Sequence, residues 1–212
     1  MLFHHQRDAT VNERGFLTRL AKAIVTMRGV GPTTEAAVRR FIQTGELRAS
    51  DGNSIGAAMR ALPFGWTTPV AATTQRRELT VRLSRATHGA PVAIMSACVV
   101  AEMAAWAIEQ HPSDAVVAAG LREAEHLARQ YALDSATIRT LREAAAGDWG
   151  SANGGLNLDA VATMATVLHV LRKATGLASA MKEAVALAWI LELGPFSKNV
   201  WSDLVAGRRK RW

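Results

Sequence analysis

The chain has 212 residues, one cysteine and a formal charge of +7, with 25 lysines and arginines against 18 acidic residues. This length suits a single domain that buries about 70% of the surface of its unfolded chain. One cysteine excludes a disulfide framework and a thiolate metal site, so we expect a reducing, cytoplasmic setting. Four of the positive charges lie at residues 208–211, and we read them as a solvated end of the chain rather than a nucleic-acid site.

The spacing of apolar residues predicts helices throughout, and no segment has the alternation of a strand. The abundance of alanine and leucine and the scarcity of aromatic residues agree with an all-α protein. In chain order, the predicted helices span residues 13–27, 34–44, 56–62, 75–86, 91–109, 114–131, 135–146, 158–174 and 178–193. We expect a compact bundle of antiparallel helices packed around the segment 91–109.

The segment 91–109 is the one stretch whose apolar character suggests a membrane helix. It carries Glu102 near its middle and Pro91 at its start, and a carboxylate at the centre of a membrane span is costly. Residues 1–7 lack the apolar core of a signal peptide. We therefore expect no membrane association and a buried central helix, with Met59, Met95, Met103 and Met164 as core filler.

A glycine-containing loop enters the short helix at residue 56 and is followed by Arg60. Glycine allows the backbone to approach a ligand closely, and a guanidinium suits phosphate or carboxylate. The spacing by itself is more typical of an ordinary loop that leads into a helix with a surface arginine than of a phosphate-binding loop. Upstream lies the sequence RGVGPTT at residues 28–34, and downstream lies RATHGAP at residues 85–91.

These three motifs, in this order, resemble the ADP-ribosylglycohydrolase family from about residue 13 to about residue 187. The resemblance implies an all-α fold, which would be incomplete in this chain. It also implies hydrolysis of the glycosidic bond between ADP-ribose and a modified protein side chain or related acceptor. ADP-ribose or an ADP-ribosylated substrate is then the expected ligand.

The resemblance also implies a set of ADP-ribose-binding residues. They are Asn53, Gly56, Ala57, Ala58, Met59, Arg60, Thr87 and His88. Ile55 stands where family members often have an asparagine, which removes a hydrogen-bonding side chain. A histidine that caps or bridges helices is the alternative reading of His88.

Family members hold magnesium or manganese with an Asp-Asp-Thr motif and a later Gly-Gly-Asp-x-Asp-Thr motif, and neither occurs here. The nearest candidate for the first is residues 8–10, which supply one carboxylate. Residues 188–193 or 194–199 stand in the place of the second, and Glu192 and Asp203 are the only carboxylates after Glu183. The chain's own residues therefore predict no metal site.

Three explanations stay open: a truncated reading frame, a fragment completed by a second polypeptide, and a homologue that keeps the ligand pocket without hydrolysis. We divide the chain into an extension at residues 1–12, a helical domain at residues 13–193 and a basic tail at residues 194–212. The alternative to a glycohydrolase is a non-catalytic helical protein that binds ADP-ribose or a protein partner. An incomplete bundle also predicts self-association through exposed apolar surface.

Overall fold

The computed structural model describes residues 12–27, 29–149, 159–176, 178–182 and 184. Its α-helices are α1 (Glu13–Ala23), α2 (Pro32–Thr44), α3 (Gly56–Met59), α4 (Leu62–Trp66), α5 (Thr73–Arg85), α6 (Pro91–Ile108), α7 (Ser113–Gln130), α8 (Ser135–Ala146) and α9 (Ala160–Lys173). A 3₁₀ turn, η2 (Val70–Ala72), precedes α5. No strand occurs among the described residues, so the predicted all-α class is confirmed.

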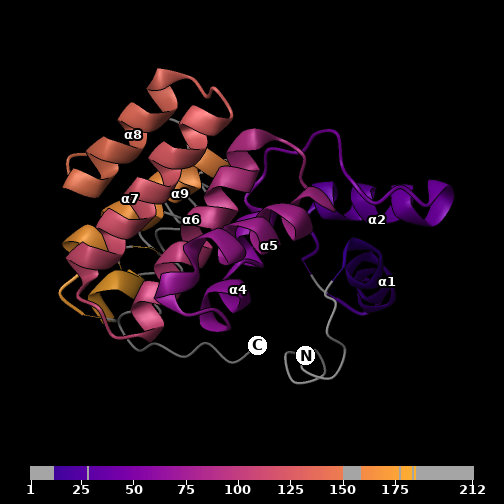
Figure 1. The fold of residues 1–212 in the computed structure, drawn as a ribbon, viewed down its shortest axis with the longest axis horizontal. Coiled ribbons are helices and arrows are strands. Elements are labelled where there is room, and N and C mark those ends of the chain that lie inside the picture. The colour runs from indigo at the N-terminus through magenta and orange to yellow at the C-terminus, as the bar shows by residue number, and fades with distance from the viewer. Residues whose placement is uncertain (1–11, 28, 150–158, 177, 183, 185–212) are drawn as a thin grey trace, which may run out of the picture.

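Helix α6 is the centre of the molecule, with α7, α8 and α9 on one side and α4 and α5 on the other (Figure 1). It is apolar all round because it has neighbours all round, and two thirds of it is buried. By length and composition it would pass as a membrane span. Its burial among other helices agrees with the predicted core helix.

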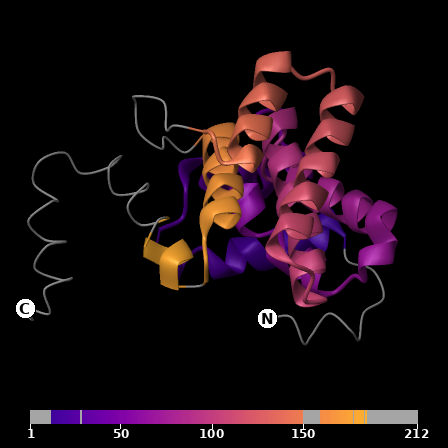
Figure 2. The ribbon, with the colours of Figure 1, turned by 90° about the vertical axis from the view of Figure 1, so that its left-hand side faces the viewer.

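The main core lies where α6 meets α7, α8 and α9, which run side by side as an upright layer in the second view (Figure 2). Met95, Met103 and Met164 are buried there, as predicted. A Cβ on Gly120 of α7 would lie 2.6 Å from the sulfur of Met103, so a larger residue here would have to displace this flexible side chain.

A second, smaller contact joins α3 and α4 to α6 through alanines and one glycine. Ala57, Ala58 and Ala61 are nearly inaccessible to solvent and pack against Ala97 and Ala101. A Cβ on Gly65 would collide with the backbone of α6 at Ala101. Small side chains thus bring the segment that carries Arg60 directly onto the central helix.

Several helix ends follow the expected signals. Gly45 and Gly147 end α2 and α8 in the left-handed conformation, and Asp134 caps α8 through its side chain. The segment predicted as one helix at residues 56–62 is instead two short helices, α3 and α4, and Pro63 lies in the first turn of α4, where proline is tolerated. Asp159 caps α9 through its side chain.

Helix α1 ends at Ala23, four residues before its predicted end, and Val25 and Met27 are 82% and 50% exposed. Apolar spacing continues through this stretch, but no described segment buries these two side chains. The predicted helix at 178–193 is described only in part, and residues 178–182 are helical.

Candidate functional site

Six polar side chains from four separate segments meet beside α3, and we call them the site cluster. They are Thr33, Thr34, Ser54, Arg60, Thr87 and His88. Thr33 and Thr34 lie in the first turn of α2, Ser54 precedes α3, Arg60 follows α3, and the Thr87–His88 pair follows α5. Residues from far apart in the chain are therefore joined by hydrogen bonds at one place.

Glycines make this convergence possible. Gly52 has φ +101°, a conformation that favours glycine, and a Cβ at this position would also collide with Thr33. A Cβ on Gly56 would lie 2.9 Å from Nε2 of His88. The N–H of Gly89 donates to the carbonyl of Asp51 at 2.6 Å, which ties the loop after α5 to the loop before α3.

His88 is fully buried, with a relative exposure of 0%. Its Nδ1 lies 2.8 Å from Oγ1 of Thr87 and 3.3 Å from Nη2 of Arg60, and its Nε2 lies 3.0 Å from Oγ of Ser54. Burial, with the nearby Arg60 cation as a second cause, lowers the pKa of His88 from 6.5 to about 4. The imidazole is neutral at pH 7.

Arg60 is the cation of the cluster. Its Nη1 donates to Oγ1 of Thr34 at 3.1 Å, and its Nη2 donates to Oγ1 of Thr87 at 2.6 Å. Burial lowers the pKa of Arg60 to about 10, so the guanidinium stays charged at pH 7. Within the described residues all of its hydrogen-bond partners are uncharged, which leaves a largely buried cation without a carboxylate beside it.

An open groove of about 750 Å³ lies between α2 and the loop at residues 49–53. Thr33 and Thr87 belong both to the groove wall and to the site cluster, and Asn53 and Asp51 line the opposite side. The volume is within the range that holds a nucleotide-sized ligand. The groove therefore places ligand space next to the cluster.

The structure brings together four of the eight residues predicted to bind ligand: Gly56, Arg60, Thr87 and His88. Asn53 lines the groove, and its backbone carbonyl accepts from the N–H of Ala160 at 3.1 Å.

The remaining three predicted residues lie apart from the cluster's hydrogen bonds. Ala57 and Ala58 are buried against α6. Met59 is 71% exposed, so its prediction as core filler is wrong. The exposed position follows from its place on α3, whose other face carries the two buried alanines.

Sequence reasoning missed Thr33, Thr34 and Ser54 as members of the cluster. The two threonines are in the RGVGPTT motif, and the sequence alone assigned them no role in binding. Gly31 is the actual N-cap of α2, which leaves both hydroxyls available for Ser54 and Arg60. The repeated threonine directly after Pro32 was the available signal.

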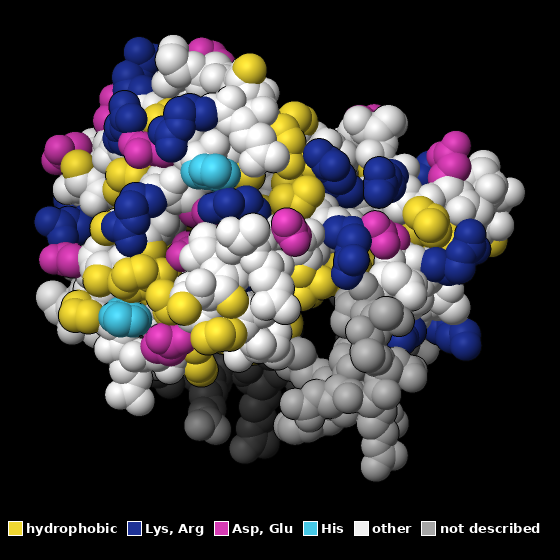
Figure 3. Space-filling model, viewed as in Figure 1, with side chains coloured by type: hydrophobic (Ala, Val, Ile, Leu, Met, Phe, Trp, Pro, Cys, Tyr) yellow, Lys and Arg dark blue, Asp and Glu magenta, His cyan; other side chains and the backbone are white. Residues whose placement is uncertain are grey.

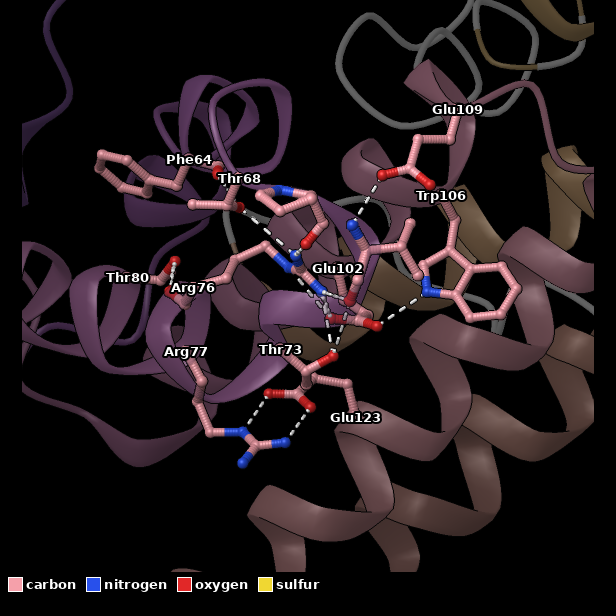
Figure 4. A network of polar contacts seen from close by, with 12 residues as sticks. Phe64, Thr68, Thr73, Arg76, Arg77, Thr80, Glu102, Trp106, Glu109 and Glu123 are labelled. Atoms are coloured by element: carbon pink, nitrogen blue, oxygen red, sulfur yellow. Dashed lines mark hydrogen bonds and ion pairs between the residues drawn. The ribbon is translucent and has the colours of Figure 1, made fainter.

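A second polar network fastens the turn between α4 and α5 (Figure 4). Arg76, which is 1% exposed, pairs with Glu102 on α6 and donates to the carbonyl of Pro69 at 2.8 Å. Trp106 donates from Nε1 to the other oxygen of Glu102 at 2.9 Å. The apolar α6 therefore tolerates Glu102 because every oxygen of this carboxylate has a donor.

This network lies at one end of the α4–α5 hairpin, and the site cluster lies at the other end. The hairpin begins after Arg60 and finishes before Thr87. A further ion pair, Arg77 to Glu123 on α7, holds α5 from the outside at 2.6 Å. The two arms that deliver Arg60 and Thr87 are thus anchored on the central helices.

No group of three or more histidine, cysteine or acidic side chains that could hold a metal ion occurs among the described residues. The nearest candidates from the sequence, residues 8–10 and the carboxylates Glu192 and Asp203, lie outside that part of the chain. Cys98 is buried in the core, and burial raises the pKa of its thiol.

The family model described as ADP-ribosylglycohydrolase matches residues 1–189 of the chain. No curated protein matches the chain.

Proposed function

Because the chain belongs to the ADP-ribosylglycohydrolase family, we propose that its site cluster and groove recognise the ADP-ribose part of an ADP-ribosylated protein or related acceptor. The family suggests that the reaction is hydrolysis of the glycosidic bond between ADP-ribose and the modified side chain or acceptor. The modified side chain would lie outside the groove.

The observation that carries this proposal is the charge state of the cluster. Arg60 is a largely buried cation whose described partners are all uncharged. One of these partners, Thr87, lines a groove large enough for a nucleotide. A diphosphate would supply the missing negative charge, and guanidinium is well suited to phosphate oxygens. Asn53, exposed at the groove, has both a donor and an acceptor for a ribose hydroxyl.

Metal-dependent hydrolysis is the general chemistry of this family, and the metal would activate water beside the anomeric carbon. The described residues do not form a group of acidic side chains that fits a divalent ion. We therefore derive no catalytic step through a metal and confine the proposal for this cluster to ligand recognition.

Thermal unfolding tests the recognition step. A ligand that binds only the folded state raises the melting temperature, and the shift grows with ligand concentration. We expect ADP-ribose to raise the melting temperature and adenosine, which has no phosphate, to raise it less. Equal shifts for the two compounds would contradict a role for Arg60 in diphosphate recognition.

The second candidate function is ADP-ribose binding without hydrolysis. It is favoured because the described residues contain no group of three or more histidine, cysteine or acidic side chains that could hold a metal ion. Release of ADP-ribose from an ADP-ribosylated protein, measured with and without magnesium or manganese, separates the two candidates. Metal-dependent release would establish the hydrolase. Binding of ADP-ribose without any release would establish the binding protein.

A further inference from the structure

A continuous path of hydrogen bonds runs through His88 from Arg60 to the groove. Nη2 of Arg60 donates to Oγ1 of Thr87 at 2.6 Å, and this hydroxyl lies 2.8 Å from Nδ1 of His88. Beyond the ring, Nε2 of His88 lies 3.0 Å from Oγ of Ser54, which donates to Oγ1 of Thr33 at 3.1 Å. Five side chains from four segments form this path, which we call the His88 relay.

Arg60 determines the direction of the relay. A guanidinium has donors only, so Oγ1 of Thr87 accepts from it and has its own hydrogen to donate to Nδ1 of His88. Nη2 of Arg60 also faces Nδ1 at 3.3 Å, and a proton on Nδ1 would point at that cation. This assigns the lone pair to Nδ1 and the proton to Nε2, which then donates to Ser54.

Thr33 is the end of the relay that borders ligand space. Thr33 and Thr87 both line the groove, but Thr87 is only 1% exposed and its hydroxyl faces Nδ1 of His88. Within the described part of the chain the hydroxyl of Thr33 makes one hydrogen bond, as the acceptor from Ser54. The hydroxyl hydrogen of Thr33 is therefore available to an acceptor in the groove.

We propose that Thr33 is a ligand-binding residue, and that the His88 relay holds its hydroxyl as a donor toward an anionic oxygen in the groove. The identity of that oxygen, one of the diphosphate oxygens of ADP-ribose, rests on the proposed function. The direction of the relay rests only on the geometry of the cluster. Hydrogen bonds aligned head to tail polarise one another, so the cation at the buried end strengthens the donor at the groove end.

Affinity for ADP-ribose, measured by calorimetry, tests the role of Thr33. We expect Thr33→Val to weaken binding about ten- to a hundredfold, the usual cost of a lost hydrogen bond to a charged acceptor. Thr44→Val is the matched control, because Thr44 lies at the far end of the same helix, and its hydrogen bonds among the described residues go to its own helix and to the backbone of Glu46. Equal affinity of Thr33→Val and the wild type would overturn the proposal.

The tautomer of His88, read from its ring ¹⁵N chemical shifts, tests the relay without any ligand. We expect an unprotonated Nδ1 and a protonated Nε2 in the wild type, and a rise in the Nδ1–H form in Arg60→Met. A protonated Nδ1 in the wild type would overturn the direction of the relay. If ADP-ribose does not bind the wild type, the proposed function fails, while this measurement still decides the relay.

Discussion

At the scale of single residues, His88 makes the stability of the protein depend on pH. Its folded-state pKa of about 4 lies below the ordinary 6.5, so the unfolded chain takes up the proton first as the pH falls. The contribution of this group is fully present above pH 6.5, is lost progressively down to pH 4, and is worth at most roughly 3 kcal/mol. We expect the free energy of unfolding, measured with urea, to fall more between pH 7 and pH 4.5 in the wild type than in His88→Gln.

The His88→Gln comparison removes the pH dependence of the carboxylates, which both proteins share. If the free energy of unfolding fell by the same amount from pH 7 to pH 4.5 in the wild type and in the variant, the imidazole would not be held neutral by its surroundings.

Gly56 tests how closely the loop before α3 approaches His88. Because a Cβ would lie 2.9 Å from Nε2, we expect Gly56→Ala to displace the ring and to lower the free energy of unfolding by about 1–3 kcal/mol. Gly176→Ala is the control, since among the described residues no atom other than those of its chain neighbours lies within 4 Å of its Cβ position. Chemical denaturation measures both, and equal stability of the two variants would contradict the close contact.

At the scale of elements, the buried pair Arg76–Glu102 anchors the α4–α5 hairpin on α6. Replacing one partner leaves the other charge buried and unpaired, so we expect Glu102→Gln to cost about 3 kcal/mol of unfolding free energy. Glu125→Gln breaks a mostly exposed pair with Arg142 and is expected to cost less than about 1 kcal/mol. Urea denaturation measures both losses of unfolding free energy. Equal losses in the two variants would contradict the anchoring role of Glu102.

Helix positions were predictable because apolar periodicity and capping residues act locally. The segment Ser135–Ala146 shows this best, since it matches the predicted range, with Asp134 as its N-cap and Gly147 as its C-cap. Helix α1 was predicted too long because the periodicity of residues 24–27 carries no information on whether a neighbour buries them. The division into α3 and α4 depends on the alanine contact with α6, which is a tertiary effect.

At the scale of the whole molecule, the site was only half predictable. Arg60, Thr87 and His88 belong to motifs that mark the family, but Thr33 and Ser54 enter the site through hydrogen bonds between segments. The pairing of Glu102 with Arg76 was not predictable from the sequence either, because the two residues lie 26 positions apart. Local patterns do not specify which side chains meet across a fold.

Self-association is a further expectation for the whole molecule. Met59, Leu62 and Trp66 lie at helical spacing on the α3–α4 segment and are 71%, 39% and 49% exposed. We expect light scattering to show association that rises with concentration and falls in Trp66→Gln. A monomer at all concentrations would contradict this expectation.

Calorimetric titration of ADP-ribose into the wild type and into Arg60→Met, first without magnesium and then with it, tests the central claim most directly. We predict binding by the wild type without metal, and binding by Arg60→Met that is weaker by at least about tenfold. Absence of binding by the wild type under both conditions, or unchanged affinity in Arg60→Met, would contradict recognition of ADP-ribose by this cluster.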